Sequence, residues 1–205
     1  MFKRTIFITF LFFSLSAKAA PYVSLLYGLN SYTDEKKNAY DFTLRGNPAK
    51  VIIGQRYAHL EFEMFARFSS SSGEFIHDGL NNKVEQSSKV FGAGMGIYLF
   101  PALKLNVGIS INSIKESLLN SVTDIQKSDI ANKFGLTDSL LLGPYFGADF
   151  NLLTLGKIKF YTSLNYYSYS SIGGKEIELA FGVKIPFGGG SSRSSSFDPL
   201  KAMFQ

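Results

Sequence analysis

Apolar and polar residues alternate most clearly between residues 90 and 112. Apolar side chains fill the odd positions from Ala93 to Leu99 and from Leu103 to Ile111, whereas glycine, amide and hydroxyl residues and one lysine fill the even positions. A period of two, kept over two runs of roughly ten residues, is typical of β-strands with one apolar face. Pro101-Ala102 leaves room only for a tight turn between the runs, so we predict an antiparallel hairpin.

The same alternation predicts six further strands, at residues 22–30, 50–57, 60–68, 140–152, 158–169 and 177–187. Tight turns are expected at residues 58–59 and 154–156. Polar segments that look like long loops occupy residues 31–48, 69–89 and 113–138, and a shorter one surrounds Gly173-Gly174. Long and short connections therefore alternate, which gathers the long ones at one end of the sheet.

Two folds could use such strands. A soluble sandwich would bury the aliphatic face, whereas a membrane barrel turns it toward lipid and lines a narrow lumen with the small polar face. The sandwich has no reason to place every long loop at one end, but an outer-membrane barrel does. We therefore predict an all-β fold, an eight-stranded antiparallel up-and-down transmembrane β-barrel.

Two local features qualify this prediction. Pro144 lies inside the predicted strand 140–152 and cannot donate to a hydrogen-bond ladder, so we expect a bulge or a missing bond there. Leu118, Leu119, Val122 and Ile125 have helical spacing, which favours a short amphipathic helix over one end of the sheet.

The barrel is predicted to occupy residues 20–187, with a different segment on each side. Residues 1–19 look like a secretory signal peptide, because Lys3 and Arg4 precede an apolar run of about ten residues and the small residues Ala17 and Ala19 suit a cleavage site. Residues 188–205 begin with a Gly- and Ser-rich stretch, which is typical of a flexible tail.

Composition agrees with an exported β protein. The chain is 45% hydrophobic and contains 20 Phe, 11 Tyr, 19 Gly and no Cys, so no disulfide supports it. Its 21 basic residues outnumber 16 acidic ones, but Lys3, Arg4 and Lys18 of the predicted signal peptide account for most of the excess. The charge therefore gives no support for nucleic-acid binding. Nothing in the sequence calls for a cofactor or a metal.

Two stretches of the chain resemble a known family. One is a hairpin pattern of glycine, tyrosine and alternating apolar residues, seen at residues 54–64 and again at 96–107. The other is the last predicted strand, where Gly182, Ile185 and Phe187 stand at the spacing of a barrel-assembly signal. The chain resembles the small eight-stranded outer-membrane β-barrel proteins of Gram-negative bacteria, the group of opacity-type, Ail-like and OmpA-like transmembrane domains. The resemblance implies an outer-membrane location and recognition by the barrel assembly machinery.

Charged residues on the polar face of the strands form the main candidate site. The alternation predicts that ten of them point into the lumen: Lys50, Arg56, Glu61, Glu63, Arg67, Lys104, Asp149, Lys159, Glu178 and Lys184. An eight-stranded barrel leaves just enough interior space for side chains, and unpaired buried charge is unfavourable by several kcal/mol. We expect these residues to pair into a plug; a gated ion path is the alternative.

Three enzyme-like patterns were weighed against structural interpretations. Glu61 and Glu63 could form an acid/base pair, but an eight-stranded barrel lacks an open cleft. His77, beside Asp78 and Ser69–Ser72, could serve a lipid A-modifying enzyme, although the His-x-Ser motif of the deacylases is missing. Gly92–Gly96 superficially matches a dinucleotide loop but lies within a strand with no helix after it.

The sequence therefore predicts a non-enzymatic, monomeric surface protein whose loops serve adhesion, envelope contacts or a structural role; a lipid A-modifying enzyme and a narrow ion pore remain alternatives. Expected partners are outer-membrane lipid, a host or envelope protein, and lipopolysaccharide. Basic residues of the predicted loops could contact lipopolysaccharide phosphates: Lys36, Lys37, Arg45, Lys83, Lys89, Lys127 and Lys133.

Overall fold

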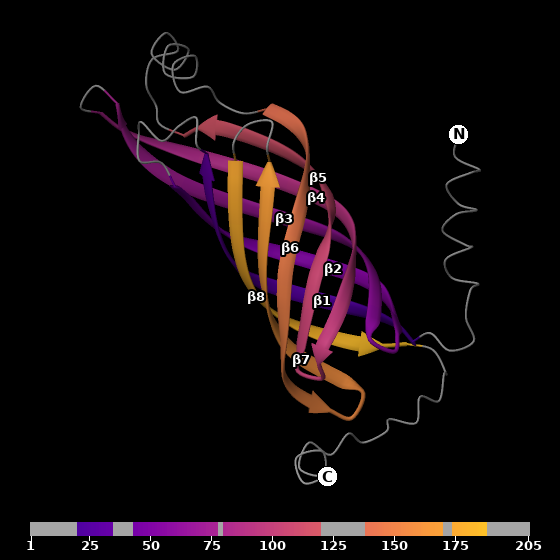
Figure 1. Cartoon of the computed structure of the whole chain (residues 1–205). Helices are drawn as coiled ribbons and strands as arrows, with labels where there is room; N and C mark the ends of the chain where they lie inside the picture. Colours follow the sequence, from indigo (N-terminus) through magenta and orange to yellow (C-terminus); the bar gives the residue numbers. More distant parts are fainter. Residues whose placement is uncertain (1–19, 35–42, 78–79, 120–137, 170–173, 188–205) are drawn as a thin grey trace.

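The computed structural model describes residues 20–34, 43–77, 80–119, 138–169 and 174–187, and these form a closed barrel (Figure 1). Each strand pairs with its neighbours in sequence, all pairs are antiparallel, and β8 closes the barrel against β1. The strands are β1 (Ala20–Asp34), β2 (Thr43–Tyr57), β3 (Leu60–His77), β4 (Leu80–Phe100), β5 (Leu103–Leu118), β6 (Asp138–Leu155), β7 (Ile158–Tyr169) and β8 (Gly174–Pro186). The predicted eight-stranded up-and-down topology is confirmed.

The register makes the strands tilt strongly. Following paired residues from Tyr22 through each strand in turn leads back to β1 at Tyr32, ten residues farther along the same strand. A stagger of this size in an eight-stranded barrel inclines the strands by about 45° to the axis and leaves an interior that side chains can fill. Figure 1 shows the resulting oblique strands.

Alternation along the strands separates two environments. Large apolar side chains point outward and stay exposed; Leu29, Met64, Ile109 and Phe181, from four strands around the barrel, are each more than 60% exposed. The inward positions carry most of the buried polar and charged side chains. This is the reverse of a water-soluble barrel, in which the apolar side chains would be inside.

The outward apolar positions form a band with clear limits. On β5 the apolar run extends from Leu103 to Ile111 and ends at Ser113, and on β8 it begins after Lys175. With about 3.4 Å per residue and strands tilted by about 45°, the β5 run covers about 20 Å along the barrel axis. That is close to the apolar band of about 25 Å expected for a barrel in a bilayer. No helix among the described residues is long and apolar enough to cross a membrane.

Glycines on the inner wall make room for aromatic rings. A Cβ added at Gly92 would lie 2.4 Å from the ring of Phe65, and one added at Gly94 would lie 2.1 Å from the hydroxyl oxygen of Tyr145. These contacts are far shorter than van der Waals separation, so only glycine allows the rings to lie flat against the opposite wall. The glycine-rich run therefore serves packing in the lumen.

Three tight turns lie at one end of the barrel, which we call the turn end. They connect β2 to β3, β4 to β5 and β6 to β7, and two of them contain a left-handed residue, Ala58 at φ 47° and Gly156 at φ 60°. The first and last strands also meet at this end, where the Phe187 amide donates to the Pro21 carbonyl at 3.0 Å.

The strands run farther toward the opposite end than the sequence pattern predicted. Residues 69–89 are not a loop: β3 and β4 continue through them, paired from Ser69–Ser88 to His77–Leu80. The serine-rich sequence has weak strand character of its own, but each strand supplies the other's backbone hydrogen bonds, so pairing overrides local preference. β1, β2 and β5 likewise extend into the segments expected to be loops.

Two local predictions also need correction. Leu118 belongs to β5 and Leu119 has no regular structure, while Val122 and Ile125 lie outside the described residues, so the proposed helix does not begin where expected. The register opposite β5 continues unbroken through Pro144 without a bulge, and pairing with β7 begins one residue later, at Tyr145. The irregularities occur instead at Tyr98/Phe100 and Asn151/Leu153.

Candidate functional site

A layer of charged side chains fills the lumen near the turn end. Lys104, from β5, lies at its centre and contacts three carboxylates, with its Nζ 2.9 Å from Glu61, 3.0 Å from Glu63 and 2.9 Å from Asp149. Lys184, from β8, binds Glu61 from the other side at 2.8 Å. Glu61 and Glu63 both point inward because they stand two residues apart on β3, and closure of the barrel brings the lysines to them.

Tyrosine hydroxyls complete the coordination of these carboxylates. Tyr98 donates to Glu61 at 2.8 Å and Tyr145 donates to Glu63 at 3.3 Å. The Tyr22 hydroxyl lies 3.1 Å from Glu61 and 3.3 Å from Glu63. Buried carboxylates are tolerated only when their oxygens are bonded in this way. The turn-end layer is therefore a connected network in which carboxylates, amines and hydroxyls satisfy one another.

A second layer lies deeper in the barrel and is centred on Arg67. This guanidinium is fully buried and forms ion pairs with Glu176 and Glu178, both from β8. Asn30 and Tyr169 donate to Glu176, and Asn165 donates to Glu178 at 3.0 Å. An arginine held by two carboxylates with further amide and hydroxyl donors is a strong and geometrically specific arrangement.

Lys50 lies between the two layers in an aromatic cage. Its Nζ is 4.3 Å from the centre of the Phe65 ring, 5.7 Å from that of Tyr145 and 5.9 Å from that of Tyr167. The amine also donates to the Tyr167 hydroxyl at 3.3 Å, and no described carboxylate forms an ion pair with it. Ring faces therefore stabilise this 3% exposed cation where a counter-ion would otherwise be expected.

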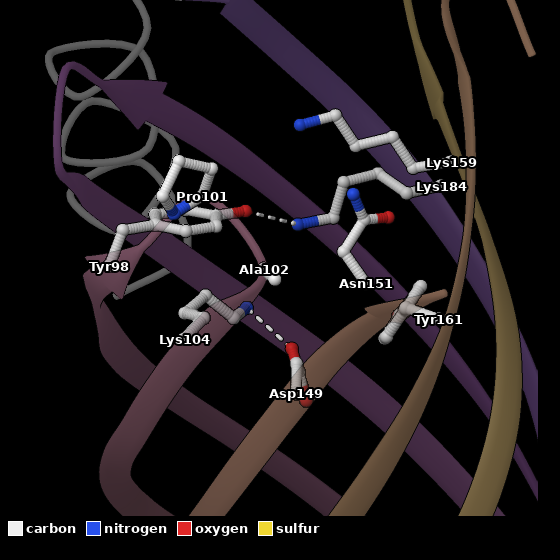
Figure 2. Close-up of a pocket in the computed structure, with 9 residues that line it drawn as sticks. All are labelled: Tyr98, Pro101, Ala102, Lys104, Asp149, Asn151, Lys159, Tyr161 and Lys184. Atoms are coloured by element: carbon white, nitrogen blue, oxygen red, sulfur yellow. Dashed lines mark hydrogen bonds and ion pairs between the residues drawn. The ribbon is translucent and has the colours of Figure 1, made fainter. Parts of the chain in front are cut away.

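The mouth of the lumen at the turn end contains a small hollow (Figure 2). Lys104, Lys184 and Asp149 of the turn-end layer form its floor, and Lys159, Asn151 and Tyr161 line its side. Arg56 lies beside the mouth, with its guanidinium 4.2 Å from the centre of the Tyr98 ring and its Nε donating to the Ala58 carbonyl at 3.0 Å.

The structure places the ten predicted lumen residues in four positions. Glu61, Glu63, Lys104, Asp149 and Lys184 form the turn-end layer, Arg67 and Glu178 belong to the deeper layer, Lys50 lies between them, and Arg56 and Lys159 are half-buried at the mouth. Eight of the ten are thus buried, and six of the eight form ion pairs with another residue of the predicted set.

Sequence reasoning missed Glu176 and the tyrosines. Glu176 was left out because the last strand was taken to begin at Ile177, although Glu176 shares the inward parity of Glu178. Extending the alternation by one residue would have found it. The role of Tyr22, Tyr98 and Tyr145 had no signal of this kind, because tyrosine suits the outer face of a barrel equally well.

The enzyme-like patterns have other surroundings. Glu61 and Glu63 are both bound by Lys104 and lie inside the barrel wall, not in an open cleft. Gly92–Gly96 is part of β4 and packs against rings. His77 ends β3 opposite Leu80, whereas Asp78 lies outside the described residues; Ser71 binds Asn30 inside the barrel. No group of three metal-ligating side chains occurs in the described part of the chain.

The residues of the predicted assembly signal occupy the end of the last strand. Gly182 points inward, where a Cβ would lie 2.7 Å from Leu26 and 2.9 Å from Tyr161. Ile185 and Phe187 point outward and are 40% and 48% exposed. β8 itself ends at Pro186, one residue before the predicted limit.

A closed barrel with an apolar outer band, a charged interior and three tight turns at one end defines the class of protein. An apolar surface around the whole circumference is stable only against lipid, and closure leaves no strand edge unpaired within the bilayer. The chain is an integral outer-membrane β-barrel protein. In such barrels the short turns face the periplasm and the opposite end faces outward.

No protein-family model and no curated protein matches the chain. Three solved structures are similar to it. Neisserial surface protein A is 13% identical with a TM-score of 0.49, covering 82% of this chain and 99% of that one. The attachment invasion locus protein Ail of Yersinia pestis is 12% identical with a TM-score of 0.48, covering 83% and 99%. The outer membrane protein OprG from Pseudomonas aeruginosa is 11% identical with a TM-score of 0.48, covering 82% and 97%.

Proposed function

We propose that this chain is a non-enzymatic surface protein whose barrel is a closed anchor and whose outward end makes contacts with lipopolysaccharide and with host or envelope proteins. The observation that carries the proposal is the filled lumen. Two layers of buried ion pairs, centred on Lys104 and on Arg67, lie one above the other across the barrel. A barrel filled in this way is suited to hold surface segments, not to conduct ions.

The pairing of the lumen charges disfavours the alternative of an ion pore. An ion moving along the axis would have to displace Lys104 from three carboxylates and then Arg67 from two. Separating one partner of a buried pair from the other is unfavourable by about 3–5 kcal/mol, and each layer contains more than one pair. The same contacts disfavour acid/base chemistry, since Glu61 and Glu63 are already bound by amines and hydroxyls.

The outward end of the barrel offers the surface for contacts. Beyond the apolar band the outward positions become polar and charged, and three of the basic residues first considered for lipopolysaccharide, Arg45, Lys83 and Lys89, are exposed there. Lys36, Lys37, Lys127 and Lys133 lie outside the described residues. Exposed cations at this level suit the phosphates of lipopolysaccharide, which lie at the outer edge of the membrane.

The termini fit the same proposal. A signal peptide at residues 1–19 would export the chain, and the outward pair Ile185 and Phe187 beside Gly182 would be recognised by the barrel assembly machinery. The monomeric barrel needs no partner to close, because β8 pairs directly with β1 over its length.

Planar-bilayer recording tests the closed state. The full chain, reconstituted in lipid, is expected to insert without producing conductance steps. Insertion is verified in the same sample by the shift of electrophoretic mobility on boiling. Regular unit steps from inserted protein would contradict the proposal and favour the ion pore.

Flotation with vesicles tests the surface role. The triple variant R45Q/K83Q/K89Q is expected to be captured less by vesicles containing lipopolysaccharide than the unchanged protein, with both captured equally by phospholipid vesicles. K157Q, in the tight turn between β6 and β7, is the matched control at the other end of the barrel. Equal capture of all three proteins would count against lipopolysaccharide contact.

A further inference from the structure

The hollow at the turn end has an unusual charge balance. It encloses about 290 Å³ of empty space, including its open mouth, and its charged lining residues are Lys104, Lys159, Lys184 and Asp149. Figure 2 shows Lys159 and Lys184 extending side by side from neighbouring strands, with Asn151 next to them. Three amines therefore surround a space that contains a single lining carboxylate.

The acidic groups near the hollow are already committed to other partners. Asp149 binds Lys104 at 2.9 Å and accepts a hydrogen bond from Ser163 at 2.6 Å. Glu61 and Glu63, below the floor, are held by Lys104, and Glu61 is also held by Lys184. By contrast, no ion pair joins Lys159 or Arg56 to a carboxylate of the described residues. The uncompensated charge at the mouth is therefore positive.

A hydrogen-bond donor in the lining also lacks a partner. Tyr161 lines the hollow, is only 5% exposed, and its hydroxyl makes no hydrogen bond. Leaving a buried hydroxyl unsatisfied is unfavourable by about 1–3 kcal/mol, so native structures usually supply an acceptor. The Arg56 guanidinium adds donors, because only its Nε is used by the Ala58 carbonyl.

The geometry points to a binding site for a small oxyanion of the phosphate class, held at the turn-end mouth by the charges of Lys159 and Arg56 and by the hydroxyl of Tyr161. An oxyanion supplies both what the uncompensated cations need and the acceptor that the hydroxyl lacks. Charge-assisted hydrogen bonds of this kind are about twice as strong as neutral ones, and the barrel wall shields the site from bulk water. A metal cation is disfavoured because the unpaired charges are themselves positive.

Calorimetric titration with inorganic phosphate tests the site. The full chain is refolded in a nonionic detergent at low ionic strength, where competing anions are few. Saturable binding with one phosphate per barrel is expected. K159Q should weaken the binding at least tenfold, Y161F should weaken it several-fold, and K159R should retain it, because arginine keeps the charge.

K157Q is the matched control, since Lys157 stands two residues away in the exposed turn and its replacement removes the same charge. It should bind phosphate as the unchanged protein does. The absence of saturable binding, or equal weakening by K157Q and K159Q, would overturn the inference, because the latter would show only general attraction to a basic surface. A boiled-versus-unboiled gel of each variant separates loss of binding from loss of fold.

Discussion

Arg67 is the residue on which the deeper layer of the lumen depends. Its guanidinium is fully buried, and it compensates both Glu176 and Glu178. R67Q would leave two buried carboxylates facing each other without a cation, which is expected to reduce the free energy of unfolding by about 3–5 kcal/mol. Equilibrium unfolding by urea in detergent micelles measures the loss.

Two further variants make the Arg67 test specific. K89Q removes a basic charge from the exposed outer surface and is expected to change stability by less than about 1 kcal/mol. Combining R67Q with E176Q and E178Q removes the uncompensated charge and should recover part of the loss. If R67Q and K89Q were equally mild, the layer would not contribute to stability as the geometry implies.

At the residue scale, the sequence predicted which side chains face inward but not how they pair. Parity along β3 places Glu61, Glu63 and Arg67 on the inner wall, because successive side chains of a strand point to opposite faces. The partners of Arg67 are 109 and 111 residues away in the chain, so no local pattern could identify them.

At the scale of the element, β5 provides a graded test of the lipid-facing assignment. Val107 lies midway along its outward apolar run, whereas Ile111 is the last apolar residue before Ser113. V107K is expected to destabilise the barrel in lipid vesicles by about 2–4 kcal/mol, and I111K by about 0–1 kcal/mol, because a charge near the interface reaches water. Urea unfolding in vesicles measures both.

The comparison between the two β5 variants contains its own control, because the substitutions occur on the same face of the same strand. Equal effects at the two positions would show that depth in the membrane does not matter, and the outer band would then be an ordinary apolar surface. A larger effect at residue 111 than at residue 107 would place the centre of the bilayer elsewhere on the barrel.

Strand boundaries show where element-scale prediction failed. The pattern of residues 69–89 is polar on both faces, so periodicity gave no reason to continue β3 and β4 into it. In the structure both strands continue, because each backbone satisfies the other's hydrogen bonds and inward serines such as Ser69 and Ser71 are buried by the facing wall. Pairing partners, not side-chain alternation, set the length of these strands.

At the scale of the whole molecule, closure predicts resistance to detergent. Every strand is paired on both sides, including β1 with β8, so no edge is available for partial opening. An unboiled sample of the full chain from an outer-membrane fraction is expected to migrate differently in an SDS gel from a boiled one. The same mobility before and after boiling, together with recovery in the soluble periplasmic fraction, would contradict a membrane barrel.

The sequence by itself determined the number of strands, their up-and-down order and the face on which each side chain lies. These properties depend on a period of two and on tight turns, which are local properties of the backbone. Only the tertiary structure decided which charges meet. The register advances by ten residues around the barrel, from Tyr22 to Tyr32, and this stagger brings Lys104 to Glu61 and Arg67 to Glu176. A pairing that depends on closing eight strands at once leaves no trace in any single strand.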